Sequence, residues 1–267
     1  MTLPSPPPPS GKTRYHVNAC TVEHIGDRGE QQDRVALLSS PRNPGALLAV
    51  LADGMGGRTG GRLASDQVVA TATSLFNELS AQDAGPRQLL EQVANEAHTV
   101  IRLTALSAEK EPHSTMVTLL LRRDHAAWAH AGDSRLYLFR HGKLRHCTED
   151  HSYASRIRAE TGAAVAERFR HMLVSALGLA TTPQVTFAET SNLAPGDVFL
   201  LCSDGLWCHF APEEMGAVLN ALPPREAAAH LLRMARDRAG GHGDNVSLAI
   251  VKLELPPETA SLVTTLY

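Results

Sequence analysis

Long apolar runs are missing from the sequence. The longest aliphatic run, LLAVLA at residues 47–52, has the length of a β-strand, whereas a membrane-spanning helix needs about 20 apolar residues. The first residues, MTLPSPPPPSGK, also lack the apolar segment of a secretory signal peptide. These absences exclude a membrane protein and predict a soluble protein of the cytoplasm.

Paired cysteines and an excess of charge of one sign are also missing. The four cysteines form no CxxC motif, which is consistent with a reducing compartment. The 25 Lys and Arg residues nearly balance the 28 Asp and Glu residues, and the net charge is −3 without any block of like charges. Because a nucleic-acid-binding protein needs a basic surface, the composition excludes nucleic acid as a partner.

A chain of 267 residues is long enough for one domain with a continuous core, and we expect a monomer. Residues 1–13 contain four consecutive prolines and predict a disordered, extended leader. A ligand for a proline-binding module is the alternative interpretation of this segment. We expect one domain at 14–255 and a tail at 256–267.

Apolar patterns predict strands and helices that come in clusters. Strands are predicted at 17–21, 35–38, 47–51, 116–121, 125–131, 135–140, 184–189, 198–202 and 247–253. Helices are predicted from residue 63 to 79, from Pro86 to 101, and at 152–166, 212–220 and 225–238. The strands between 116 and 140 read as an antiparallel meander. Clustering of this kind favours an α+β fold over a doubly wound parallel sheet.

The first two predicted helices each carry one apolar stripe. Helical spacing relates two sets of side chains: Val68, Ala72, Leu75 and Leu79 in the first helix, and Leu90, Val93, Ala97 and Ile101 in the second. We expect these helices to form a hairpin that packs on a sheet supplied by the flanking strands.

Aspartates recur at the ends of apolar strands, beside glycine or other turn-forming residues. Asp53 lies in LLAVLADGMGG and Asp204 in VFLLCSDGLW, while Asp133 lies in the turn of AHAGDSRLYLF. Asp33 and Asp244 each stand just before a strand. A single Asp-Gly pair is more often an ordinary turn. Five such sites in one chain instead indicate carboxylates that converge.

Converging carboxylates repel one another, and this repulsion raises their pKa values unless cations neutralise them. Oxygen ligands suit Mg²⁺ or Mn²⁺, and the sequence has no HExxH motif or Cys/His spacing typical of zinc. Glycine beside an aspartate allows a carbonyl group or a phosphate ester to approach closely. The residues therefore predict a divalent metal site.

These motifs resemble the metal-dependent serine/threonine protein phosphatases of type 2C, the PPM family, in their compact bacterial form. The resemblance runs from Val17 to Leu253. It rests on GDRGEQQDR, VLADGMGG followed by GRLAS, HSTMVTLLL, AHAGDSRLYLFRHGKL, TEDHS, SALG, APGDVFLLCSDGLW and GDNVSLAIV, in the family's order and approximate spacing.

The resemblance implies a four-layer αββα sandwich, with two antiparallel sheets packed face to face and helical pairs outside. It implies two Mn²⁺ or Mg²⁺ ions at one end of the sandwich. Asp53 would bridge both ions, the Gly54 carbonyl would bind one, and Asp204 and Asp244 would complete the other. Asp33 would act through water or as a nearby ligand. Asp133 would serve, with Asp204, a third and weaker metal site found in some members.

The resemblance also implies a mechanism. Arg28 stands five residues before Asp33, where the family places its phosphate-binding arginine. Without that motif, Arg28 would read as part of a surface salt bridge. Water activated by the two metal ions would attack phosphorus in line, so no phosphoenzyme is required. Cys202 lies in no CxxxxxR loop and is predicted to be a buried core thiol.

Several positions depart from the family pattern. Met55 stands where many eukaryotic members have a histidine that is proposed to protonate the leaving oxygen. Cys208 stands where some members have a further metal-binding aspartate, and Gln32 replaces the glutamate of some relatives. Among 13 histidines, only His151 in TEDHS belongs to a family motif, and a structural hydrogen-bonding role is expected for it.

The expected function is hydrolysis of phosphoserine or phosphothreonine in proteins. The expected partners are phosphorylated proteins and a cognate serine/threonine kinase. The alternative is a catalytically weak or silent member that binds phosphoproteins or a kinase. Silent members usually lose core metal ligands, whereas Asp33, Asp53, Asp204 and Asp244 are all present here.

Overall fold

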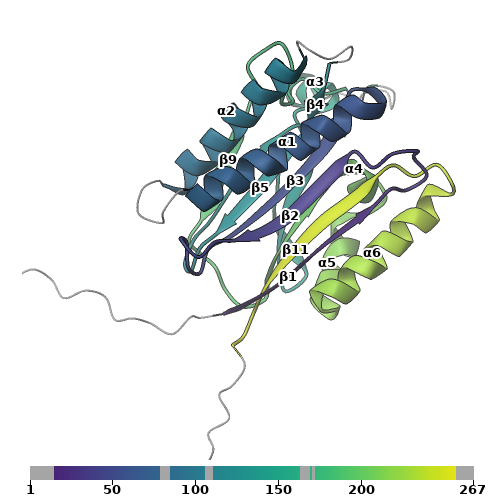
Figure 1. The fold of residues 1–267 in the computed structure, drawn as a ribbon. Coiled ribbons are helices and arrows are strands. Elements are labelled where there is room, and N and C mark those ends of the chain that lie inside the picture. The colour runs from purple at the N-terminus through teal and green to yellow at the C-terminus, as the bar shows by residue number, and fades with distance from the viewer. Residues whose placement is uncertain (1–14, 79–84, 106–110, 163–168, 170–171, 257–267) are drawn as a thin grey trace, which may run out of the picture.

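The computed structural model describes residues 15–78, 85–105, 111–162, 169 and 172–256. The predicted leader at 1–13 and residues 257–267 of the predicted tail lie outside these ranges. The described residues form two antiparallel sheets with helices on both outer faces, which confirms the predicted α+β sandwich (Figure 1). No helix in the described ranges has both the length and the apolar character to cross a membrane.

The described strands form two sheets. Sheet A has the order β1-β11-β10-β7-β8. Its strands are β1 (His16–His24), β7 (Arg135–Arg140), β8 (Lys143–Cys147), β10 (Asp197–Cys202) and β11 (Val246–Glu254). Sheet B has the order β2-β3-β5-β6-β9, with β4 paired to β3. Its strands are β2 (Asp33–Ser39), β3 (Leu47–Met55), β4 (His113–Ser114), β5 (Met116–Leu121), β6 (Ala126–Ala131) and β9 (Thr186–Thr190).

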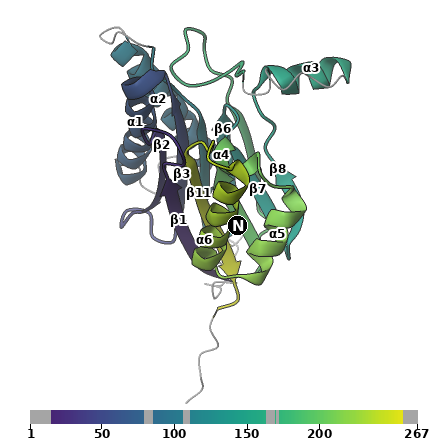
Figure 2. The same ribbon diagram turned by 90° about the vertical axis from the view of Figure 1, so that its right-hand side faces the viewer.

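Helical pairs cover the outer faces of the sheets. Figures 1 and 2 show α1 and α2 against sheet B, α5 and α6 against sheet A, and α3 projecting from one end of the sandwich. The helices are α1 (Gly57–Glu78), α2 (Pro86–Ala105), α3 (Tyr153–Thr161), α4 (Asp204–Trp207), α5 (Pro212–Ala221) and α6 (Pro224–Ala239). The bounds of α5 and α6 confirm the two helices predicted at 212–220 and 225–238.

Three buried apolar layers hold the four structural layers together. In β3, Leu48 and Val50 face α1 and α2, whereas Ala49 and Leu51 face sheet A. Successive side chains of a strand point to opposite faces, so a strand buried on both faces needs a continuous apolar run. The run LLAVLA meets this requirement. The third layer packs the outer face of sheet A against α4, α5 and α6.

The predicted helical hairpin is confirmed, with a correction to its beginning. All four predicted core residues of α2 are buried. In α1, Val68 and Ala72 are buried and Leu75 is partly buried, while Leu79 lies outside the described ranges. Helix α1 begins at Gly57 rather than at Leu63. Its first turns, GRTGG, contain no apolar residue, so periodicity could not detect them. A Cβ on Gly61 would come within 2.5 Å of the Gly54 carbonyl oxygen, so glycine lets α1 start directly against β3.

The predicted meander from 116 to 140 was wrong at its third strand. Strands β5 and β6 pair, but β6 pairs next with β9, and β7 lies in sheet A between β10 and β8. The chain crosses from one sheet to the other at Gly132, whose φ is 104°. A turn with glycine suits a hairpin and a crossover equally well, and the crossover places Asp133 at the junction of the sheets.

Other differences are local. Strand β8 and the short helix α4 were not predicted, because β8 is mostly exposed and α4 has only four residues. The helix predicted at 152–166 ends at Thr161, since Gly162 caps it with a φ of 69°. Residues 163–166 of that prediction lie outside the described ranges.

Candidate metal centre and active site

Most of the predicted site residues lie around one cavity of about 380 Å³ at an end of the sandwich. Asp53 comes from β3, Asp204 begins α4 directly after β10, and Asp244 lies just before β11. The cavity walls include Arg28, Asp53, Gly54, Asp133, Asp204 and Asp244. The seventh predicted residue, Asp33, is only 1% exposed and pairs with Asp53 across the β2–β3 ladder. All the predicted residues are therefore neighbours.

Thr115 holds the backbone on both sides of Asp53. Its hydroxyl accepts a hydrogen bond from the Asp53 amide at 2.9 Å, and its own amide donates to the Asp53 carbonyl oxygen at 2.8 Å. The same hydroxyl lies 2.7 Å from the Ser134 hydroxyl, beside Asp133. Thr115 thus links two carboxylate-bearing segments. Sequence reasoning missed this role, although Thr115 lies in the HSTMVTLLL motif.

Asp33 is a buried carboxyl with one close hydroxyl donor. Burial raises its pKa to about 7, while the hydrogen bond from the Ser203 hydroxyl, at 2.7 Å, opposes the shift. The carboxylates of Asp204 and Asp244 raise the pKa further. Because Ser203 also begins the segment that carries Asp204, it ties strand β2 of sheet B to the end of β10 in sheet A.

Asp53 carries a carboxyl group that lies among other carboxylates. Burial raises its pKa well above the usual value, and the carboxylates of Asp33, Asp204, Asp133 and Asp244 raise it further in that order. Four neighbouring negative groups therefore act on one carboxyl. All of these carboxylates except that of Asp33 line the same cavity.

The turn that carries Asp133 is fixed from the side of α4. The Trp207 indole donates a hydrogen bond to the Asp133 carbonyl oxygen at 2.9 Å. The Arg135 guanidinium lies 3.5 Å from the centre of the Trp207 ring and makes two hydrogen bonds, of 2.7 and 2.8 Å, to Asp150. This stack of a cation on an aromatic ring holds the crossover between the sheets in place.

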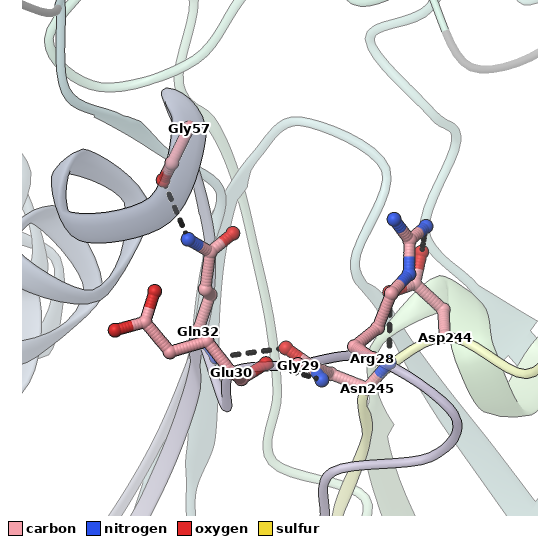
Figure 3. A pocket seen from close by; sticks show the side chains of 7 residues that line it. All are labelled: Arg28, Gly29, Glu30, Gln32, Gly57, Asp244 and Asn245. Carbon is pink, nitrogen blue, oxygen red and sulfur yellow. Dashed lines mark hydrogen bonds and ion pairs between the residues drawn. The ribbon is translucent and has the colours of Figure 1, made fainter.

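Two loops that are far apart in sequence, one with Arg28 and one with Asp244 and Asn245, lie side by side (Figure 3), and these three residues also line the cavity. The Arg28 guanidinium, 60% exposed, forms an ion pair of 2.5 Å with Asp244. The Asn245 side chain accepts a hydrogen bond from the backbone amide of Gln32 at 2.7 Å. It donates to the backbone carbonyl oxygens of Ile25 and Glu30 at 2.8 and 3.0 Å. Asn245 therefore sets the path of the Arg28 loop, a role that its place in GDNVS could have suggested.

The donor set fits hard divalent cations. Oxygen groups dominate the polar lining of the cavity, and none of its described lining residues is His or Cys. Within the described ranges, no group of three or more His, Cys, Asp or Glu side chains is already drawn together around a single point. The carboxylates instead surround a volume of about 380 Å³. That volume and the mutual repulsion at Asp53 suit more than one cation, which would offset the gathered charge.

The remaining predicted residues take the places expected of them. His151 is buried, accepts from the Gly132 amide at 3.3 Å and contacts the Thr186 hydroxyl at 2.9 Å, so its role is structural. Cys202 is fully buried in the core. Met55 lines the cavity, where its thioether cannot donate a proton. Cys208 is exposed and is not among the residues that line the cavity.

The described residues thus form a four-layer sandwich with a carboxylate-lined cavity at one end. The sequence profile of the family described as protein phosphatase 2C matches residues 21–240. The chain belongs to this family.

Two relatives and one solved structure illustrate the similarity. The serine/threonine protein phosphatase PstP of Mycobacterium tuberculosis is 31% identical over 216 residues, which cover 77% of this chain and 40% of that protein. The serine/threonine phosphatase stp of Listeria monocytogenes is 28% identical over 226 residues, covering 78% of this chain and 85% of that protein. The catalytic domain of PstP, solved in complex with two manganese ions, has a TM-score of 0.74 at 27% identity and covers 89% of this chain and 98% of that one. This chain thus spans less than half the length of the whole mycobacterial protein.

Proposed function

We propose that this protein is a metal-dependent phosphatase that hydrolyses phosphoserine and phosphothreonine in proteins. The observation that carries the proposal is the gathering of four aspartates and one arginine around a single cavity of about 380 Å³. Relatives that are named serine/threonine phosphatases support it, as does the PstP structure with two manganese ions. We propose residues 14–255 as the phosphatase domain.

The proposed roles follow from the positions of the residues. Two Mn²⁺ or Mg²⁺ ions would be held by Asp53, the Gly54 carbonyl, Asp204 and Asp244. Asp33 would act through water or as a nearby ligand. Asp133 with Asp204 would hold a third, weaker ion. When bound, such ions lower the pKa of water and offset the charge of a transferring phosphoryl group.

Arg28 is the proposed phosphate-binding residue. This residue lines the cavity, and the planar fork of its guanidinium matches two phosphate oxygens. Asn245 and Asp244 restrain the loop and the side chain, so Arg28 is held near the cavity before substrate arrives. Pre-orientation of this kind reduces the entropy lost when phosphate binds. Met55 contributes an apolar wall beside the aspartates.

The proposal extends to partners and location. A serine/threonine kinase would supply the phosphorylated proteins that this enzyme consumes. All four cysteines are free thiols, which fits the reducing cytoplasm. We also propose a monomer.

The test measures Mn²⁺-dependent hydrolysis of p-nitrophenyl phosphate and of a phosphothreonine peptide. We expect Asp53→Ala and Asp204→Ala to abolish activity on both substrates. Asp237→Ala, which removes a carboxylate from an exposed position of α6, serves as the matched control and should keep it. Circular dichroism checks that each variant is folded. Activity that survives a chelator, or that survives both cavity substitutions, refutes the proposal.

A further inference from the structure

A second and larger cavity, of about 750 Å³, lies beside the catalytic cavity. Its walls are formed by Arg28, Gly29, Glu30, Gln32, Gly57, Asp244 and Asn245. Four of these residues, Arg28, Gln32, Asp244 and Asn245, also line the catalytic cavity. The two spaces therefore share a wall.

Most polar groups of this second cavity already have partners. The Gln32 side-chain amide donates to the Gly57 carbonyl oxygen at 2.6 Å, Arg28 pairs with Asp244, and Asn245 bonds the loop backbone. Figure 3 shows Glu30 and Gln32 on the side of Gly57, and the Arg28–Asp244 pair on the opposite side. The side of the cavity opposite the arginine thus presents one carboxylate, that of Glu30.

The Glu30 carboxylate is incompletely satisfied. Its Oε2 atom is shielded from solvent and has no hydrogen-bond partner among the described residues. A buried acceptor of this kind loses its hydrogen bonds to water and forms no hydrogen bond within the protein, which costs free energy. Glu30 as a whole is half-buried and lines the cavity, so a cationic donor of a ligand in that space would offset the uncompensated charge of the carboxylate.

The surroundings of Glu30 leave room for a donor of side-chain size. Glu30 lines a cavity of about 750 Å³, and a Cβ placed on the neighbouring Gly29 would meet no atom within 4 Å. The Glu30 carbonyl oxygen accepts from Asn245 at 3.0 Å, which keeps this part of the loop in place. A restrained backbone at Glu30 reduces the entropy that is lost when its side chain pairs with a cation.

We propose that Glu30 forms a specificity subsite for a basic side chain, lysine or arginine, that flanks the phosphorylated residue of the protein substrate. This inference rests on the proposed phosphatase function. The phosphate would lie toward Arg28 and the aspartates, and the basic side chain would pair with Glu30 on the opposite wall. The cavity would thereby select phosphoproteins with a positive charge next to the phosphorylated position.

The test uses two sets of phosphothreonine peptides with Mn²⁺ present. Each peptide of the first set carries one arginine at a different position beside phosphothreonine. Each peptide of the second set carries alanine at the corresponding position. We expect at least one arginine position to raise kcat/KM about ten-fold over its alanine counterpart, which corresponds to about 1.4 kcal/mol. That ratio should fall as ionic strength rises, because salt screens the ion pair.

Two substitutions of Glu30 and one control assign the effect. Glu30→Gln keeps the size of the side chain and should bring the arginine-to-alanine ratio to about one, and Glu30→Lys should bring it below one, by like-charge repulsion. Glu226→Gln removes the same charge from an exposed position of α6 and should keep the wild-type ratio. Melting curves check that each variant is folded.

The outcomes separate this inference from the function on which it rests. A wild-type enzyme without preference for arginine at any position overturns the subsite, and so does an unchanged ratio in Glu30→Gln. Failure of the wild-type protein to hydrolyse p-nitrophenyl phosphate with Mn²⁺ instead overturns the phosphatase function. Loss of the ratio in Glu30→Gln but not in Glu226→Gln supports the subsite.

Discussion

Asp33→Asn removes a buried titratable group while keeping its shape. In the folded protein, burial raises the pKa of Asp33 to about 7, whereas an aspartate in the unfolded chain has a pKa of about 3.9. Between these values the folded state holds a proton that the unfolded state has released. Stability therefore falls as pH rises through this window, and the full cost is present above about pH 7.

The magnitude follows from the width of the window. One pH unit corresponds to about 1.4 kcal/mol, so a pKa of about 7 against about 3.9 gives a cost on the order of 4 kcal/mol. Between about pH 5 and about pH 8 the cost grows by roughly 3 kcal/mol, equivalent to about 6–12 °C in Tm for a domain of this size. Asparagine cannot ionise, so Asp33→Asn should lack this dependence.

Buried histidines act in the opposite direction and must be separated. Burial, helped by His130, lowers the pKa of His151 to about 4. The unfolded state then binds the proton that the folded state refuses, so stability rises with pH between about 4 and 6.5. Because both proteins contain these histidines, the contribution cancels when wild type and Asp33→Asn are compared at the same pH.

The assay is thermal unfolding of both proteins in chelator across this pH range. We expect the Tm of Asp33→Asn to rise relative to wild type as pH increases. With saturating Mn²⁺ the wild-type protein should instead have the higher Tm, because the metal stabilises the wild-type carboxylate and binds the Asp33→Asn variant more weakly. A difference in Tm between the two proteins that is the same at about pH 5 and about pH 8 would refute the reasoning.

Three further predictions test the framework around the site. Thr115→Val removes the hydroxyl that accepts from the Asp53 amide, and calorimetry should show Mn²⁺ affinity reduced about ten-fold or more, while Thr115→Ser retains it. Asn245→Leu removes three hydrogen bonds to the Ile25–Gln32 loop; urea unfolding should show a loss of about 3 kcal/mol, and Asn245→Asp, which keeps the acceptor, should lose less. Ile101→Ala empties a fully buried position of α2 and should cost about 2–5 kcal/mol in the same assay. The exposed Leu103 on the same helix provides the control, and Leu103→Ala should change stability by less than about 0.5 kcal/mol.

Local patterns predicted those elements whose burial is periodic. The stripe of α2 and the continuous apolar run of β3 specify their partners directly, since each face must be covered. Strand β8 gives no such signal, because most of its residues face solvent. The glycines at the start of α1 also give no signal, because they add no apolar side chain to the helical pattern. Gly61 is required by its close contact with Gly54, a residue on another element.

The course of the chain between the sheets could not be predicted from local sequence. Strands β6 and β7 are separated by a short turn typical of a hairpin, yet each pairs with a strand more than fifty residues further along the chain. Such pairings are decided by which faces the whole chain can bury together. The family resemblance supplied the sandwich that the periodicity of the residues alone did not.

The proposed metal ligands were predictable as residue types in motifs, whereas the residues that support them were not. Asp53, Asp204 and Asp244 stand out because chemistry requires carboxylates beside glycine or a turn. Asn245 and Ser203 are ordinary polar residues in sequence. Their partners lie 170 or more residues away, as in the hydrogen bonds from Ser203 to Asp33 and from Asn245 to Glu30.

The position of the cavity links metal binding to the fold itself. Asp53 belongs to sheet B, Asp204 and Asp244 flank strands of sheet A, and Asp133 lies at the crossing between them. Without cations, repulsion among these groups pushes apart the sheets that the apolar layer pulls together. Cations reverse the sign of that contribution at the same place. The cavity therefore lies where the packing of the two sheets against each other holds like charges close together.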